Sequence, residues 1–233
     1  MFATDFQYDY EPKKQATVKT QPTVQAKMLA EFMMGEKECE YSVWFPTHYK
    51  YEKLSDDSEQ LNKWMNEHEK LVSYRADELQ KEGFTVYIEN ANWFTVKGTN
   101  YPISISGKPD IIAIKDDLVR IEDCKTGKVK PSHEMQVLVY MRLCPYAPET
   151  KWYTKNRIIE GAVIYWNGAT EVSHSKLDVG FKNLFRKSLA IIASSEPAWT
   201  APNKWACLYC NISKDYCVDR FEGESDTEPH DLF

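Results

Sequence analysis

Charged side chains lie within two apolar runs in the stretch ISGKPDIIAIKDDLVRIEDCKTG, which covers residues 105–127. Buried strands seldom carry unpaired charge, so Asp110, Asp123 and Lys125 are candidates for chemistry. If the stretch is a hairpin that turns at Asp116–Asp117, Asp110 and Asp123 face each other across neighbouring strands. Lys125 then lies on the same face, because side chains alternate along a strand and Lys125 is the second residue after Asp123.

Two carboxylates that face each other on an apolar surface repel, and one takes up a proton unless a cation lies between them. Oxygen ligands of this kind suit Mg²⁺ or Mn²⁺. Lys125 cannot bind a cation, but it can help to deprotonate a water or stabilise negative charge on a phosphoryl group. The same residues also fit a structural Asp–Lys ion pair at the end of a strand, and both interpretations stay open.

The surrounding sequence predicts an α/β domain with a mixed sheet and flanking helices. A long amphipathic helix is expected over residues 57–82, ending at Gly83, with one apolar stripe turned to the core. Two strands are expected to meet around Asn90–Asn92. Further elements are expected over residues 26–45 (mostly helix), 131–144 and 177–194 (helices) and 161–168 (strand).

The tetrapeptide GKPD, which ends at Asp110, precedes EDCKTG, which contains Asp123 and Lys125. The pentapeptide QVLVY then places Gln136 and Tyr140 one helical turn apart. These motifs, in this order, resemble the PD-(D/E)XK nuclease superfamily, and the last resembles the QxxxY motif of its RecB-like branch. The resemblance runs from about residue 35 to residue 220. It implies a restriction-endonuclease-like fold and a Mg²⁺- or Mn²⁺-dependent deoxyribonuclease.

The resemblance also implies roles for individual residues. His68, on the predicted helix, is expected to be a metal ligand with Asp110 and Asp123, and the backbone carbonyl of Cys124 is expected to complete the shell. Gln136 and Tyr140 are expected to position Lys125 or the DNA strand. The alternatives are a satisfied core histidine and an ordinary polar helix face.

Three cysteines, Cys207, Cys210 and Cys217, lie in the segment CLYCNISKDYC. A Cys-x₂-Cys turn lets two thiolates reach one metal, and a fourth ligand must come from elsewhere. Cys39 is the candidate, because this chain resembles RecB-like nucleases in which one cysteine precedes the core and three follow it. A 4Fe–4S cluster is implied, and structural Zn²⁺ is the alternative. Either would join the N- and C-terminal segments.

The 233 residues carry a formal net charge of −6, which argues against a broad basic surface. A nucleic-acid partner would be held by a local groove or through a divalent metal. The aromatic and basic run WFPTHYK, residues 44–50, is one candidate for stacking single-stranded bases. No apolar run of about 18 residues is present, which predicts no membrane span. We expect a cytoplasmic protein of a bacterial, archaeal or phage-infected cell, without a secretory signal and without disulfides.

The resemblance favours exonuclease action on single-stranded DNA in recombination, repair, CRISPR adaptation or phage DNA metabolism. The alternative is a non-catalytic DNA-binding or scaffold subunit that keeps the fold. A protein partner at the acidic tail and a homo-oligomer are further expectations. Three segments are expected: a flexible arm over residues 1–25, the nuclease domain with its cysteine segment over 26–220, and the acidic tail over 221–233.

Overall fold

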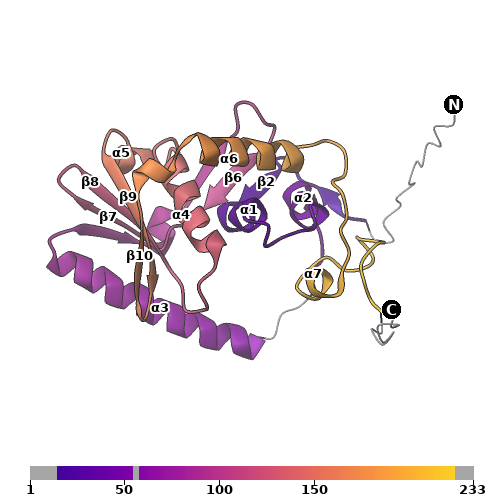
Figure 1. The fold of residues 1–233 in the computed structure, drawn as a ribbon, viewed down its shortest axis with the longest axis horizontal. Coiled ribbons are helices and arrows are strands. Elements are labelled where there is room, and N and C mark those ends of the chain that lie inside the picture. Colours follow the sequence, from indigo (N-terminus) through magenta and orange to yellow (C-terminus); the bar gives the residue numbers. More distant parts are fainter. Residues whose placement is uncertain (1–14, 55–57, 224–233) are drawn as a thin grey trace, which may run out of the picture.

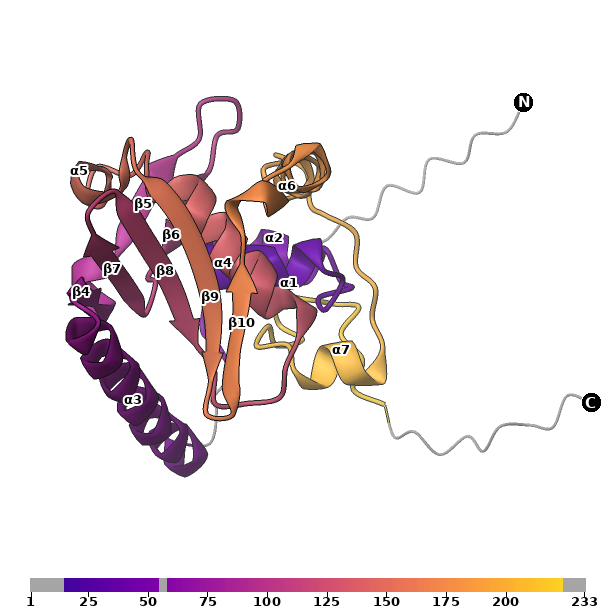
Figure 2. The same ribbon diagram turned by 60° about the vertical axis from the view of Figure 1, so that its left-hand side comes forward.

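The computed structural model describes residues 15–54 and 58–223. The largest sheet among the described residues has five strands in the order β10-β9-β8-β7-β4 and lies on the left in Figure 1. Helix α3 covers one face of this sheet and α4 covers the other (Figure 2). The predicted α/β class with a mixed sheet is therefore confirmed. The elements of this layer are β4 (Thr85–Ile88), β7 (Ile111–Lys115), β8 (Leu118–Cys124), β9 (Ile158–Tyr165), β10 (Gly168–Val172), α3 (Ser58–Lys81) and α4 (Pro131–Leu143).

The hairpin formed by β7 and β8 has the predicted register. Ile111 pairs with Glu122, and Ile112 pairs with Ile121. The turn uses Asp116, whose φ of 51° lies in the left-handed region that Asp tolerates better than most residues. Because the register is fixed, the residues just beyond the last pairs, among them the two candidate aspartates, come to the same end of the sheet.

Strand β9 pairs with β8 in parallel, and α4 is part of the crossover between them. The helix lies very close to the sheet at Gly161. A Cβ atom there would lie 2.4 Å from Val137 Cγ1 and 2.7 Å from Met141 Sδ, both on α4. This glycine therefore sets how closely α4 approaches the strands that carry the candidate site.

A smaller three-stranded sheet lies beside the first, with the order β2-β6-β5. The two strands expected to meet at Asn90–Asn92 belong to different sheets, because a 3₁₀ turn, η1 (Glu89–Asn92), separates β4 from β5. Helix α1 packs against α4 and α6. The elements here are β2 (Thr23–Gln25), β5 (Phe94–Lys97), β6 (Ser104–Gly107), α1 (Ala26–Met33), α5 (Lys151–Thr154), η2 (His174–Lys176) and α6 (Val179–Ile192).

Residues 15–25 were expected to belong to a flexible arm, but they contain two short strands. Strand β2 pairs with β6, and Val24 is buried in the core. A second short strand, β1 (Thr17–Val18), pairs with β3 (Tyr49–Lys50). Residues 17–25 are thus held by two sheets. Residues 1–14, and residues 224–233 of the acidic tail, lie outside the described residues.

Helix α3 does not bury the whole of its apolar stripe. Its second half packs on the sheet through Leu71, Val72 and Leu79. In its first half, Trp64 and Met65 are about half exposed, at 48% and 49%. The reason is length, because the helix projects beyond the strands (Figure 1).

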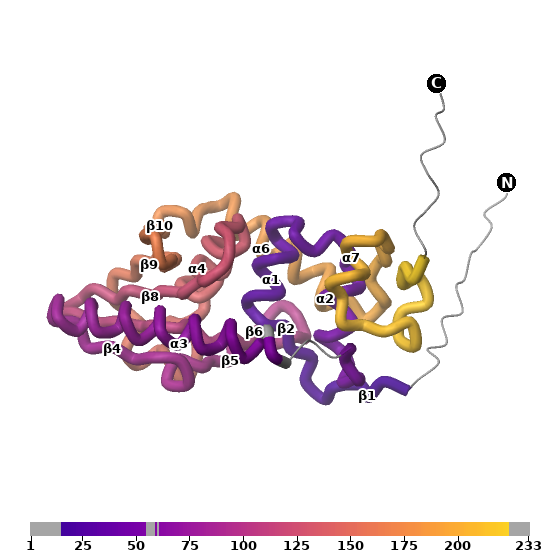
Figure 3. The backbone as a smooth tube through the Cα atoms, turned by 90° about the horizontal axis from the view of Figure 1, so that it is seen from below, coloured from indigo at the N-terminus to yellow at the C-terminus, as the bar shows by residue number. Residues whose placement is uncertain are grey.

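The C-terminal segment with three cysteines packs on α2 (Tyr41–His48), which belongs to the N-terminal part of the chain (Figure 3). Tyr41, Phe45, Ile212 and Tyr216 form a small aromatic core there, and the Tyr41 hydroxyl donates to the carbonyl of Tyr216 at 2.8 Å. The short helix α7 (Lys204–Leu208) begins the segment. No helix among the described residues is long and apolar enough to span a membrane.

Candidate active site

Asp110 ends the GKPD tetrapeptide and lies directly before β7. Its Oδ2 accepts a hydrogen bond of 2.7 Å from the backbone amide of Cys124, at the end of β8. The same oxygen lies 3.2 Å from Nε2 of His68, which reaches it from α3. Asn92, a residue that the sequence analysis did not identify, donates from Nδ2 to the carbonyl of Pro109 at 3.2 Å. Asp110 is therefore fixed through both its side chain and its neighbouring backbone.

Asp123 is the second carboxylate, and it is buried. Nζ of Lys125 lies 2.5 Å from Asp123 Oδ2 in an ion pair. Gln136 Nε2 donates to Asp123 Oδ1 at 3.0 Å. Within the described residues Oδ2 accepts no well-directed hydrogen bond, so the ion pair alone compensates its charge.

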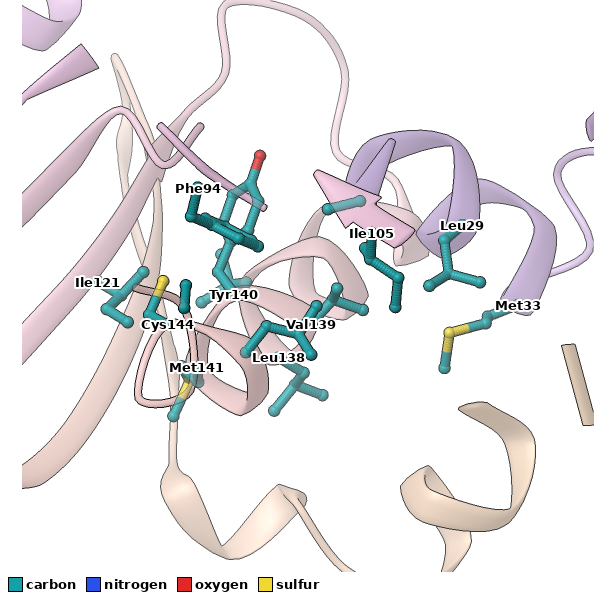
Figure 4. Packing of buried hydrophobic residues seen from close by; sticks show 14 of the residues in the cluster. Leu29, Met33, Phe94, Ile105, Ile121, Leu138, Val139, Tyr140, Met141 and Cys144 are labelled. Carbon is teal, nitrogen blue, oxygen red and sulfur yellow. The ribbon is translucent and has the colours of Figure 1, made fainter. Parts of the chain in front are cut away.

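Gln136 and Tyr140 lie on the face of α4 that meets these groups. Gln136 Oε1 accepts from Lys125 Nζ at 3.2 Å, and its Nε2 also lies 2.7 Å from the Tyr140 hydroxyl. That hydroxyl reaches the carbonyl of Lys108 at 3.4 Å. The Tyr140 ring packs edge-on against Phe94, with ring centroids 5.9 Å apart (Figure 4). The two α4 residues thus connect Lys125 to the short segment between β6 and β7 that contains Asp110.

The two buried carboxylates of the site are balanced by Lys125 and His68, and the pKa shifts follow from these contacts and from burial. Burial raises the pKa of Asp123 to about 6, Lys125 opposes that rise, and Asp110 adds to it. The hydrogen bond to Asp110 raises the pKa of His68. Burial acts to lower the pKa of Lys125, but the Asp123 carboxylate outweighs burial and the net effect is a rise. The raised pKa values show that Asp123, His68 and Lys125 each favour the protonated form in this buried setting.

In residues 15–54 and 58–223, no three His, Cys, Asp or Glu side chains are arranged as a ready-made metal site. The donors are held in pairs, His68 with Asp110 and Lys125 with Asp123. The donor chemistry still fits a divalent cation, because two carboxylates and an imidazole converge and one buried oxygen has no directed hydrogen bond. A cation would supply the positive charge that the pairs now supply.

Glu122 is a second residue that the sequence analysis missed. It points to the opposite side of β8 from Asp123, and its side chain is fully buried. Arg75 donates to both of its oxygens, at 2.8 and 3.0 Å, and Arg120 donates at 2.8 Å. These bonds tie β8 to α3, the helix that carries His68. A glutamate at an inward position of a strand demands a cationic partner, and this was the available signal.

The four cysteines singled out in the sequence line one cavity, although among the described residues no three of them are arranged to hold a metal ion. Cys39, Cys207, Cys210 and Cys217 line one small cavity between α2 and the C-terminal segment. The two remaining cysteines, Cys124 and Cys144, are fully buried elsewhere in the core.

The cavity also has features of a thiolate site. The backbone amide of Ala201 donates to Cys39 Sγ at 3.4 Å, and that of Phe221 donates to Cys207 Sγ at 3.3 Å. Burial raises the pKa of Cys217 to about 11, and the neighbouring sulfurs of Cys39 and Cys210 add to the rise. Thiolates there require a compensating cation, which is what a bound metal or cluster provides.

One of the comparisons with known proteins identifies the family of the chain. A family model described as the PD-(D/E)XK nuclease superfamily matches residues 35–217, which include both sets of converging residues. The crystal structure of SSO0001 is similar, with 15% sequence identity and a TM-score of 0.43, over 83% of this chain and 85% of that chain. A comparison with curated protein sequences finds no match. The family match covers well over half of the sequence, and the chain therefore belongs to the PD-(D/E)XK nuclease superfamily.

Proposed function

We propose that the protein is a Mg²⁺- or Mn²⁺-dependent deoxyribonuclease of the RecB-like branch, with the catalytic unit over residues 26–220. The observation that carries this proposal is the convergence of Asp110, Asp123 and Lys125 at one end of the β7–β8 hairpin. These are the positions at which the sequence resembles the superfamily motif. Gln136 and Tyr140 support the cluster from α4, as the resemblance implies.

Each residue has a proposed role. Asp110, Asp123, His68 and the backbone carbonyl of Cys124 hold the divalent cation. When bound, the cation supplies Lewis-acid activation of water and of the phosphodiester. Asp123 also orients Lys125 through their ion pair.

The proposed role of Lys125 is to contact the phosphodiester, because its ammonium group lies beside the Asp123 carboxylate. Its three N–H donors can bind the non-bridging oxygens, whose negative charge grows as the phosphorus–oxygen bond breaks. Gln136 keeps Nζ in place through its Oε1. Tyr140 in turn fixes the Gln136 amide, so the two α4 residues are positioning residues.

We propose exonuclease action on single-stranded DNA as the specific activity. The resemblance alone supports this choice, and the net charge of −6 implies only that the strand is bound locally. End-labelled and circular single-stranded substrates separate the possibilities. An exonuclease releases short products from the linear strand only, whereas cleavage of the circle indicates an endonuclease.

The four cysteines form the second part of the proposal. We propose that Cys39, Cys207, Cys210 and Cys217 hold a 4Fe–4S cluster that joins α2 to the C-terminal segment. Their common cavity and the amide donors to two of the sulfurs support this. Iron and sulfide in equal amounts in anaerobically purified protein would support a cluster, whereas zinc without sulfide would replace it by a structural Zn²⁺ site.

The decisive experiment compares wild-type protein with Lys125→Ala in a DNA cleavage assay with Mn²⁺. Loss of the ammonium group should lower the rate by about 100-fold or more. Lys128→Ala, which changes an exposed lysine in the same loop, is the matched control and should retain activity. Equal cleavage rates in the wild-type and Lys125→Ala preparations would contradict the proposal. They would favour a non-catalytic DNA-binding subunit.

A further inference from the structure

A second cavity, of about 360 Å³, opens between the β1–β3 pair and strands β2 and β6. Three lysines line it: Lys19, Lys50 and Lys53. Among the residues that the structure describes, no aspartate or glutamate lines the cavity, although the chain has 35 acidic residues against 29 basic ones. Concentrated positive charge without a carboxylate partner is the composition of an anion-binding site.

Lys19 is held in place at the wall of the cavity by two hydrogen bonds. Its Nζ donates to the carbonyl of Pro46 at 2.5 Å, which holds the ammonium group against the cavity wall. Its backbone amide donates to the carbonyl of His48 at 2.8 Å. Burial, followed by the charges of Lys53 and Lys50, lowers the pKa of Lys19. The three ammonium groups are thus close enough to repel, and an anion among them removes that repulsion.

Neutral donors complete the lining. Hydroxyl groups come from Thr23, Ser106, Tyr49 and Tyr51. Burial raises the pKa of Tyr51 to about 12, so its phenol stays a neutral donor near neutral pH. Lysines as point charges, together with hydroxyls, are the groups that contact backbone phosphates in protein–nucleic acid complexes.

The cavity lies close to the candidate active site along the chain. Ser106 is on β6, and the GKPD motif follows it directly, so Asp110 is the fourth residue after it. A fully extended chain of that length spans at most about 14 Å. A short stretch of single-stranded DNA with one phosphate bound among the lysines could therefore also reach the catalytic carboxylates.

We propose that this cavity, defined by Lys19, Lys50 and Lys53, binds a phosphate of the single-stranded DNA substrate. The proposal rests on the proposed function and names the part of the molecule that holds the strand. It also accounts for the aromatic and basic run at residues 44–50. Trp44 and Phe45 are buried core residues, whereas Tyr49 and Lys50 line the cavity.

The test measures binding of full-length, anaerobically purified protein to a fluorescent oligo-dT strand in EDTA, at several salt concentrations. K50Q/K53Q changes two exposed lysines, and K19Q/K50Q/K53Q removes all three charges. We expect each variant to raise the Kd about tenfold or more. The slope of log Kd against log salt should fall by about 0.7 for each phosphate that the variant no longer neutralises.

The matched control is K81Q/K151Q/K155Q, which makes the same change of charge at exposed lysines on α3, on α5 and directly after α5. Its Kd and salt slope should stay at the wild-type values. An equal rise of Kd in this control, an unchanged Kd in both cavity variants, or absence of binding by the wild-type protein would overturn the proposal. Oligonucleotides with a 5′-phosphate, a 3′-phosphate or hydroxyl ends identify the phosphate, because a terminal phosphate gives a preference for one end and an internal one gives none.

Cleavage by the wild-type protein with Mn²⁺ is measured in parallel. Binding that depends on the three lysines without any cleavage would reject the nuclease function and leave the cavity assignment intact. Cleavage that the cavity variants retain at the wild-type Kd would reject the cavity and leave the nuclease function intact. The two proposals therefore fail separately.

Discussion

The guanidinium group of Arg75 binds the buried carboxylate of Glu122 through two hydrogen bonds, of 2.8 and 3.0 Å. Glu122 directly precedes Asp123, and Arg75 follows His68 by two turns of α3. One ion pair therefore sets the position of the strand that carries a catalytic carboxylate relative to the helix that carries the histidine. It does so without contact with the site itself.

Removal of this pair should cost stability and activity together. Arg75→Ala leaves a buried charge with Arg120 as its remaining partner, and we expect a loss of about 3 kcal/mol in the free energy of unfolding. Denaturation in urea measures this loss. Glu78→Gln, which removes the charge of the partly exposed partner of Arg75, is the control and should change stability by less than about 1 kcal/mol. If Glu78→Gln lowered the free energy of unfolding as much as Arg75→Ala, the buried pair would have no special role.

Close packing of α4 on the sheet gives the second prediction. Gly161→Ala places a Cβ within 2.4 Å of Val137 Cγ1, and we expect a loss of stability of about 1–3 kcal/mol. Gly127→Ala is the control, because nothing lies within 4 Å of its Cβ position. Thermal denaturation compares the two variants. The close approach would be unimportant if both melted at the same temperature.

Gln136 gives a prediction about the site. Gln136→Ala removes the donor to Asp123 Oδ1 and the acceptor for Lys125 Nζ. We expect the cleavage rate to fall by about 10–100-fold while far-ultraviolet circular dichroism stays unchanged. Glu134→Ala, on the exposed side of the same helix, should keep its activity. A structural role alone would lower the melting temperature without lowering the rate of the protein that remains folded.

Local patterns in the sequence were sufficient to predict some parts of the fold. The β7–β8 register followed from the position of the Asp116–Asp117 turn, α6 followed from its amphipathic pattern, and the start of α4 followed from Pro131. Burial along α3 was not predictable, because the sequence does not show where the sheet beneath the helix ends. Strand β10 was missed because it is polar and mostly exposed at the sheet edge.

In the candidate site, too, some residues could be predicted from the sequence and others could not. Residues in the motifs could be found because their spacing puts them on one face of a strand or helix. Asn92 and Glu122 were missed because their roles depend on backbone groups and side chains that are distant in sequence. The lysines of the second cavity come from the segment after β1, from β3 and from the loop after it, so only the pairing of β1 with β3 shows that they belong together.

The cysteine site gives the last prediction. Cys210→Ser should strip the bound metal, because one of four thiolates is lost, and should lower the melting temperature by loosening the C-terminal segment from α2. Cys144→Ser is the control, since Cys144 is buried in the main core and does not line the cavity. The measurements are iron, zinc and sulfide contents of anaerobically purified proteins.

The same variant should also affect DNA binding. Tyr51 packs on the aromatic core between α2 and the cysteine segment and also lines the lysine cavity, so Cys210→Ser should weaken DNA binding as well. Unchanged metal content in Cys210→Ser, or a metal-free wild-type protein, would contradict the prediction.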